Sequence, residues 1–144
     1  MKKMSIGWRE WCALPELNIP QIKAKIDTGA KTSALHAFFV EPFEENGRQM
    51  VRFGVHPLQK HVDLEIICSC PIKDYREVRD SGGHQEMRYV IETPVRLGER
   101  IWPIEMTLTN RDSMQFRMLL GRRAMAGMQV LPDKSFLFGR PEQE

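Results

Sequence analysis

The stretch Ile22-Lys23-Ala24-Lys25-Ile26-Asp27-Thr28-Gly29-Ala30 is a short alternating segment that runs directly into an acidic turn. Apolar residues and lysines alternate, which predicts a half-buried β-strand over 22–26. Gly29 permits backbone angles that a side chain would forbid, so the chain can reverse and direct peptide N–H groups toward the Asp27 carboxylate. Thr28 adds a hydroxyl that can donate or accept a hydrogen bond. This turn is the candidate active site.

Short strands and turns account for most of the remaining sequence. Asn-Gly tolerates positive φ at both central positions, so a hairpin turn is expected at 44–47. Residues 130–138 predict a terminal hairpin, and good helix formers predict one short helix over 122–128. The fold class is therefore expected to be all-β with one short C-terminal helix. The expected strands cover residues 5–13, 22–26, 37–43, 51–55, 64–70, 91–97, 104–108 and 118–120.

Length and composition exclude several classes of protein. A chain of 144 residues suits one compact domain over 1–144 and is too short for two pepsin-like lobes. A net charge of +2 with 28% charged residues does not indicate a nucleic-acid binder. No apolar run reaches membrane-spanning length, the N-terminus lacks a signal-peptide core, and three cysteines show no disulfide framework. A cytoplasmic protein that binds neither membrane nor nucleic acid is expected.

The segment from Asp74 to Arg88 is highly charged and carries Ser81-Gly82-Gly83 near its centre. Two adjacent glycines between polar arms predict a hairpin tip whose backbone can approach a ligand closely. The same composition also fits a plain exposed loop. The residues alone leave both interpretations open.

Five short motifs, which follow one another along the chain, together resemble those of one known family. The Asp-Thr-Gly turn and the later apolar-apolar-Gly resemble the retropepsin type of aspartic peptidase. More narrowly, the chain resembles a bacterial family labelled ATP-dependent zinc proteases, which are retropepsin-like proteins associated with an ATP-grasp glutamate ligase. An Asp-Thr-Gly tripeptide alone is weak evidence, whereas the ordered set is strong. The motifs are Asp27–His36, Phe53–Pro57, Ser81–His84, Leu108–Asp112 and Leu119–Arg122.

The resemblance implies a retropepsin-like closed barrel of short strands, with Ser81-Gly82-Gly83 at the tip of a flap that closes over substrate. It also implies that Gly29 and Ala30 line the binding cleft. The catalytic residues it implies are Asp27, Thr28 and Gly29, with Thr28 bracing the two turns of a dimer across its axis rather than performing chemistry. The substrate-binding residues we expect are Ala30, Lys31, Arg79, Ser81, Gly82, Gly83, Arg88 and Arg122.

Hydrolysis by carboxylates requires a second acidic group. One ionised carboxylate activates water while a protonated one polarises the carbonyl, and two close carboxylates achieve this by sharing a proton. The chain holds one Asp-Thr-Gly turn, and neither Asp112 nor Asp133 has a comparable small-residue turn. A homodimer in which two copies of Asp27 meet at a twofold axis is therefore expected. The commoner use of Asp before Gly, as a turn-capping residue, is the alternative.

Basic residues near the motifs suggest a substrate. Lys31, Arg79, Arg88, Arg122 and Arg123 lie in or beside segments expected to approach the cleft, and guanidinium groups pair well with carboxylates. They favour an acidic or glutamate-rich peptide or protein substrate, which would suit a functional link to a glutamate ligase. They fit solubilising charges equally well.

Zinc and ATP, which the family label includes, find little support in the sequence. It contains neither a His-Glu-x-x-His helix nor a phosphate-binding Gly-x-x-x-x-Gly-Lys loop. His56, His61, Cys68 and Cys70 could gather a metal, but alternation places both cysteines on an apolar strand face. No metal or cofactor is expected. His36 is the one histidine with a candidate role at the turn, and a hydrogen-bonded packing residue is the alternative that we favour for it. A non-catalytic peptide-binding module and a zinc-dependent hydrolase stay as alternatives to the aspartic endopeptidase.

Overall fold

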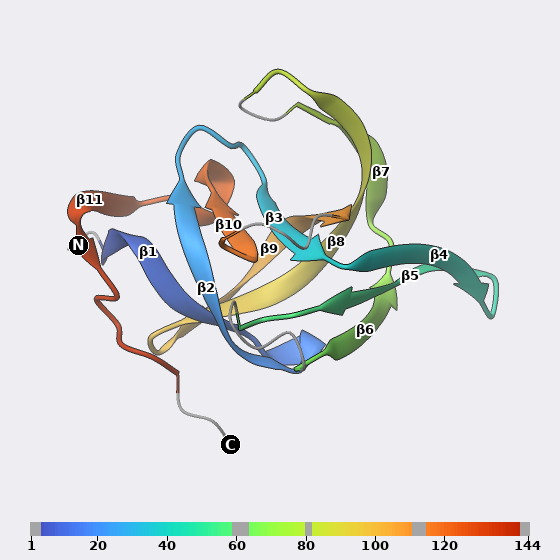
Figure 1. Cartoon of the computed structure of the whole chain (residues 1–144), viewed down its shortest axis with the longest axis horizontal. Coiled ribbons are helices and arrows are strands. Elements are labelled where there is room, and N and C mark those ends of the chain that lie inside the picture. Colours follow the sequence, from blue (N-terminus) through green and yellow to red (C-terminus); the bar gives the residue numbers. More distant parts are fainter. Residues whose placement is uncertain (1–3, 59–63, 80–81, 111–114, 142–144) are drawn as a thin grey trace.

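The computed structural model describes residues 4–58, 64–79, 82–110 and 115–141, and strands make up most of these ranges (Figure 1). Two short 3₁₀ helices, η1 (Pro15–Leu17) and η2 (Arg122–Met125), complete the regular structure. The strands are β1 (Met4–Leu14), β2 (Ile19–Asp27), β3 (Ser33–Ala37), β4 (Phe39–Glu45), β5 (Arg48–Val55), β6 (Ile66–Pro71), β7 (Asp74–Arg79), β8 (Gln85–Leu97), β9 (Arg100–Asn110), β10 (Met118–Gly121) and β11 (Met128–Ser135).

Eight strands form one sheet in the order β11-β1-β2-β10-β3-β9-β8-β7, and β4, β5 and β6 form a second sheet. The larger sheet curls until β1 also pairs with β8, where Ala13 lies opposite Arg96. We describe it as a curled sheet rather than as the closed barrel expected from the sequence. The nearly all-β class that the sequence predicts is confirmed.

Strand β2 forms as its alternation predicts. Ile22, Ala24 and Ile26 are buried, while Lys23 is half-buried and Lys25 is exposed. Burial of the apolar side chains contributes about 25 cal/mol for each Å² removed from water, which favours this register. One hydrophobic cluster joins these residues to apolar side chains of the neighbouring strands and of β5. The end of β2 is therefore fixed against a packed core.

The expected helix over 122–128 is wrong, because only the single turn η2 forms there. Gly121 precedes it without a side-chain cap, and Ala126 follows in an extended conformation with ψ 128°. Gly127 then takes a positive φ of 77°, and β11 begins one residue later. Too few residues stand between β10 and β11 for a helix to offset its nucleation cost.

The expected terminal hairpin over 130–138 is also wrong. Residues 128–135 form the single strand β11, which pairs in parallel with β1. Pro132 lies in the register shift between the pairs Gly7–Leu131 and Arg9–Ser135, where the absence of its N–H breaks no ladder bond. The chain turns later, where Phe136 has a positive φ and accepts a hydrogen bond from Gly139 N–H.

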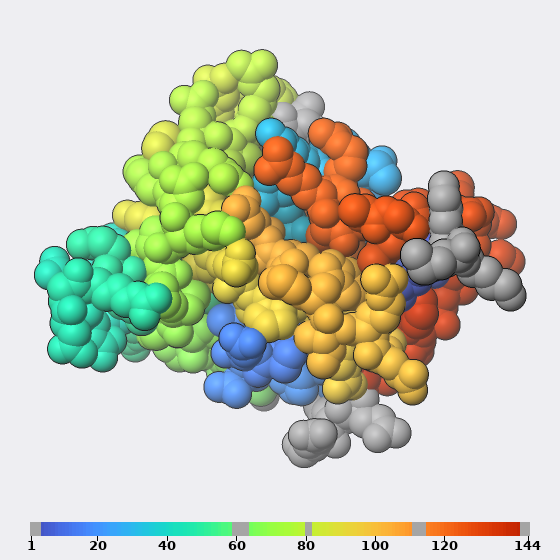
Figure 2. Space-filling model, turned by 180° about the vertical axis from the view of Figure 1, so that it is seen from behind, coloured from blue at the N-terminus to red at the C-terminus, as the bar shows by residue number. Residues whose placement is uncertain are grey.

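The second sheet sits beside the first, and its β4–β5 hairpin stands out from the body of the molecule (Figures 1 and 2). Asn46 and Gly47 both have positive φ at its turn, as the sequence predicts. The ring of His56 stacks on Phe38 at 4.3 Å between centroids. A Cβ on Gly54 would lie within 2.7 Å of the rings of Phe38 and its neighbour, so Phe53–Pro57 builds the junction of the sheets.

No helix in the described ranges is long and apolar enough to cross a membrane.

Candidate active site

The Asp27 turn follows the last pair of the parallel β2–β10 ladder, in which Asp27 lies opposite Gly121. Gly29 N–H donates to Asp27 Oδ1 at 3.1 Å, and Ala30 N–H donates to the Asp27 carbonyl at 3.2 Å. The turn therefore directs a peptide N–H at the carboxylate, as the sequence predicts. The expected need for glycine backbone angles at this position is wrong, because Gly29 does not have a positive φ. The carboxylate is half-buried, so it stays accessible from one side.

Residues 122 and 123 hold the turn from the far end of the sequence. Arg122 N–H donates to the Ala30 carbonyl at 2.7 Å, and Arg123 N–H donates to the Lys31 carbonyl at 3.1 Å. The Arg122 guanidinium also donates to the Thr28 carbonyl at 3.0 Å. These bonds satisfy backbone carbonyls of residues 28–31 that no strand pairs. The downstream Leu-Leu-Gly-Arg motif therefore supports the Asp-Thr-Gly turn directly.

Gly121 allows the two segments to cross at van der Waals distance. A Cβ at this position would lie 2.6 Å from the Thr32 carbonyl carbon and 2.8 Å from Ser33 N. Gly121 N–H instead donates to the Ser33 hydroxyl at 3.0 Å, within the core. Strand β10 can thus lie between β2 and β3 only with glycine at its end.

A cavity of about 680 Å³ opens above the turn. Its walls come from the Asp27 turn, β3, the β7–β8 hairpin and η2, which are far apart in the sequence. In Figure 1 the β7–β8 hairpin arches over the end of β2, and from behind it rises beside the segments around residues 30 and 122 (Figure 2). The lining residues are Asp27, Gly29, Ala30, Lys31, Thr32, Ala34, His36, Arg76, Glu77, Val78, Arg79, Gly82, Arg88, Leu119, Arg122 and Arg123.

The β7–β8 hairpin, called the flap below, is the charged segment that the sequence left open. Its strands pair from Asp74–Val90 to Arg79–Gln85, and Gly83 takes a φ of 85° near the tip. Because Gly82 lines the cavity together with Asp27, this segment is a hairpin facing the turn rather than a plain loop. Ser81, predicted to bind substrate, lies outside the described residues.

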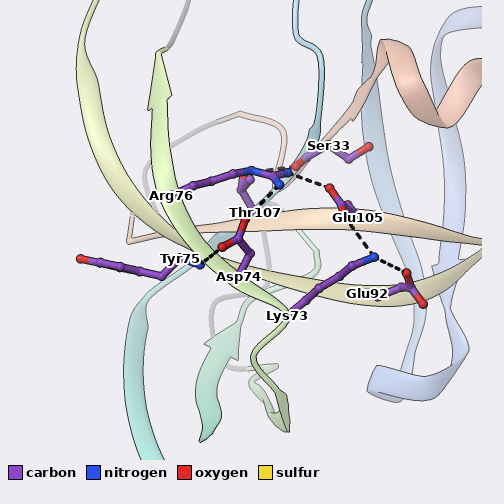
Figure 3. A network of polar contacts seen from close by, with 8 residues as sticks. All are labelled: Ser33, Lys73, Asp74, Tyr75, Arg76, Glu92, Glu105 and Thr107. Carbon is purple, nitrogen blue, oxygen red and sulfur yellow. Dashed lines mark hydrogen bonds and ion pairs between the residues drawn. The ribbon is translucent and has the colours of Figure 1, made fainter.

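An ion-pair network fixes the base of the flap (Figure 3). The Arg76 guanidinium donates to Glu105 at 2.7 Å and to Asp74 at 3.2 Å. Lys73 bridges Glu105 at 3.2 Å and Glu92 at 2.6 Å. The hydrogen bond from Arg76 is the main reason why the pKa of Glu105 is lowered from its ordinary value, and Lys73 adds to it. Glu105 on β9 thus holds Arg76 of the flap and Lys73, the residue before it, across the intervening strand β8.

Replacing Glu105 by glutamine should loosen the flap. The amide keeps the shape but removes the charge that attracts both cations, so amide hydrogen exchange in β7 should rise, by about fivefold at most for a partly exposed pair. Mass spectrometry of exchange, resolved to peptides covering 74–79, measures this. Peptides from β4 and β5 are the internal control and should not change.

The effect of Glu105→Gln should depend on pH. A carboxyl whose pKa is lowered in the folded state adds stability above its ordinary pKa of 4.5 and loses it as the pH falls through the lowered value. The difference in thermal midpoint between wild type and variant should therefore be constant near neutrality and shrink in acid below about pH 4.5. A difference that grows in acid would contradict the assigned role of Glu105.

Arg88 and His36 line the cavity with most of their surface buried. The Arg88 guanidinium donates to Glu86 at 2.7 Å and to the Thr107 hydroxyl at 3.4 Å. His36 Nδ1 shares a 2.8 Å hydrogen bond with the hydroxyl of Thr109. Both side chains therefore connect the cavity wall to β9.

The structure gathers most of the predicted site residues. Thr28 is exposed and is not part of the cavity lining, although its carbonyl is held by Arg122. Sequence reasoning missed Arg76, which lines the cavity. Arg76 lies directly opposite Arg88 in the hairpin, so alternation counted outward from the two glycines could have placed both on the inner face. The predicted residues that line the cavity are Asp27, Gly29, Ala30, Lys31, Arg79, Gly82, Arg88 and Arg122.

The candidate metal ligands serve packing in the described part of the chain. The buried Cys68 thiol lies 3.4 Å from the Leu17 carbonyl, and burial raises the pKa of Cys68 to about 12 and that of Cys70 to about 11. No group of three or more His, Cys, Asp or Glu side chains is arranged around a metal-sized site in the described ranges. His61 lies outside them.

A nearly all-β fold with an Asp-Thr-Gly turn, a crossing Leu-Leu-Gly strand and a flap is typical of retropepsin-like proteins. Comparison with known families agrees: the chain belongs to the family of the retropepsin-like aspartic endopeptidase RimB, whose model matches residues 5–142. This confirms the family resemblance found in the sequence.

Relatives by sequence carry a different name. The chain is 50% identical over 129 residues to a probable alpha-L-glutamate ligase of Desulfotalea psychrophila and 45% identical over 138 residues to one of Shewanella pealeana. These matches span 90% and 95% of this chain, but only 28% and 30% of the relatives' lengths. A solved structure of a Legionella pneumophila protein of unknown function has a TM-score of 0.78 at 27% identity and covers 95% of this chain and 99% of its own.

Proposed function

We propose that the protein is an aspartic endopeptidase that works as a homodimer, each copy providing one Asp27. The observation that carries the proposal is the Asp27 turn at the floor of a cavity of about 680 Å³, beneath a flap, in a member of an aspartic endopeptidase family. The test is peptide cleavage by wild type and by Asp27→Asn, with and without a chelator.

The chemistry requires the second copy. Besides Asp27, the described lining contains one carboxylate, Glu77, which is exposed on the flap rather than in the floor. Two Asp27 side chains at a twofold axis would share a proton. One would take a proton from the attacking water, and its mate would donate to the carbonyl oxygen of the scissile bond.

An acidic peptide suits the cavity. Lys31, Arg79 and Arg123 line it, and in the described ranges no carboxylate lies within ion-pair distance of them. Side chains of this kind remain available to substrate carboxylates. The relatives named glutamate ligases make a glutamate-rich tail the favoured substrate and support a functional link between the two activities.

Removing the positive charge of Arg79 from the flap should raise the KM for acidic peptides but not for neutral ones. Arg79→Ala should raise the KM for a glutamate-rich peptide by about tenfold, as expected for the loss of one charged contact, and leave the KM for a neutral peptide unchanged. Steady-state kinetics with the two peptides measures this. Arg48→Ala, at the exposed start of β5 on the projecting hairpin, is the matched control. Equal losses for both peptides would show that Arg79 does not select charge.

A peptide-binding module without catalysis is the second candidate. It is favoured by the presence of a single Asp-Thr-Gly turn, since one copy alone would keep the cavity and flap but lack a catalytic pair. Tight binding of acidic peptides without turnover in both wild type and Asp27→Asn would establish it.

A further inference from the structure

We propose that an anionic peptide controls the pairing of two copies, so that the substrate assembles the site that cuts it. This inference rests on the proposed homodimeric function and adds its regulation. It follows from the charges that surround Asp27 and from where they are attached.

Positive charge exceeds negative charge around the cavity. Within the described lining, Arg76 and Arg88 are matched by carboxylates outside the lining, on Asp74, Glu105 and Glu86. Four further cations then face two carboxylates, those of Asp27 and Glu77. These four cations are Lys31, Arg79, Arg122 and Arg123.

Three of the four cations, those of Lys31, Arg122 and Arg123, are on residues that follow the Asp27 turn directly or are hydrogen-bonded to this segment. The Arg122 guanidinium lies 3.0 Å from the Thr28 carbonyl oxygen, and the backbone of Arg123 is bonded to that of Lys31. Any assembly that brings two Asp27 side chains into contact must therefore bring the two sets of cations together. A proton shared by the two carboxylates makes the excess larger. Like charges opposed across an interface cost several kcal/mol.

Backbone pairing offers little to offset this repulsion at the free edge of the larger sheet. One terminal strand of this sheet is β11, where Pro132, Asp133 and Lys134 are features that oppose pairing with another strand; the other terminal strand, β7, belongs to the flap. The following segment folds back on its own chain, with the Arg140 guanidinium 4.5 Å from the centroid of the Trp11 ring. Strand pairing through β11 therefore offers little to offset repulsion between the cations at the cavity.

A glutamate-rich peptide removes the obstacle. Its carboxylates would neutralise the cations of both copies at once and, because the peptide spans the two cavities, it would link the copies as they meet. Without such a peptide the chain stays mainly monomeric and holds one carboxylate per floor, which cannot cut. Substrate charge would thus select both binding and assembly.

Sedimentation equilibrium of Asp27→Asn, which should bind without cutting, tests the inference. We expect hexaglutamate to lower the dimer Kd at least tenfold, and hexaglutamine to leave it unchanged. Salt should act in opposite directions: raising NaCl should strengthen dimers without peptide by screening repulsion, and weaken dimers formed with hexaglutamate. The double variant Lys31→Gln, Arg123→Gln on this background should dimerise more readily alone and lose most of the response, whereas Arg48→Gln should behave like its parent.

Two outcomes would overturn the inference and differ in what they leave standing. If the dimer Kd is the same with both peptides while wild type cleaves a glutamate-rich substrate, assembly is independent of substrate and the proposed peptidase function survives. If the protein stays monomeric with hexaglutamate and wild type cleaves nothing, the inference fails together with the proposed function.

Discussion

Asp27→Asn should abolish peptide cleavage, lowering kcat by roughly 10³-fold or more while leaving the fold unchanged. An amide can neither accept a proton from water nor share one with a second carboxylate, so both halves of the proposed pair are lost together. The Gly29 N–H can still donate to the side-chain oxygen of asparagine, which preserves the turn. Single-turnover cleavage of a glutamate-rich peptide, with circular dichroism as the check on folding, measures the loss.

The same experiment with a chelator separates the aspartic mechanism from the zinc alternative. Wild-type cleavage should persist in chelator, since the proposed chemistry uses two carboxylates and water alone. Loss of cleavage in chelator with recovery on added zinc would reject the aspartic mechanism. Mixing wild type with an excess of Asp27→Asn adds a further check, because inactive mixed dimers should reduce activity below that of wild type alone.

Gly121→Ala should destabilise the protein by about 1–3 kcal/mol and reduce cleavage by far more than unfolding explains. The added Cβ would lie 2.6–2.8 Å from backbone atoms of residues 32 and 33, which cannot rotate away. Either β10 or the segment after the Asp27 turn must shift, and Gly121 is the residue opposite Asp27 in the ladder. Denaturant unfolding and kcat measured at full folding report the two effects separately.

Gly29→Ala is the matched control for the stability measurement. A Cβ there would lie 3.4 Å from Asp27 Oδ1, an ordinary contact, and no backbone atom would be displaced. Its free energy of unfolding should stay within about 0.5 kcal/mol of wild type. If Gly121→Ala proved equally mild, the close crossing at the end of β10 would not be what fixes the turn.

Local sequence patterns were enough to predict the strands in which buried and exposed residues alternate, and the hairpin turn with an Asn-Gly pair. Period two marks β2, and the Asn-Gly turn marks the β4–β5 hairpin, because burial of one face and positive φ are local requirements. The predictions for the region after Gly121 were wrong because its structure depends on contacts with residues far away in the sequence. Helix formers at 122–126 and Pro-Asp at 132–133 are local signals, but β11 is held by β1, which lies at the other end of the chain.

In the candidate site too, the sequence predicts local features, whereas contacts between distant residues determine the rest. Asp27 and Gly29 could be identified from a tripeptide whose chemistry is local. The place of Arg76 at the cavity could not be read from composition, because its orientation is fixed by Glu105 on another strand. Arg88 seemed equally available in the sequence, yet it is buried against Glu86 and Thr107. Both arginines line the cavity, and only the folded hairpin shows that carboxylates already hold each of them.

The bond between the Arg122 guanidinium and the Thr28 carbonyl joins residues 94 positions apart. During synthesis on the ribosome, the acidic turn emerges long before the strand and the arginine that hold it in place. A nascent chain or a fragment ending before residue 118 would lack β10 and could not form the floor of the cavity. Under the proposed function, cleavage is therefore expected only after β10 has been synthesised and has paired with β2 and β3.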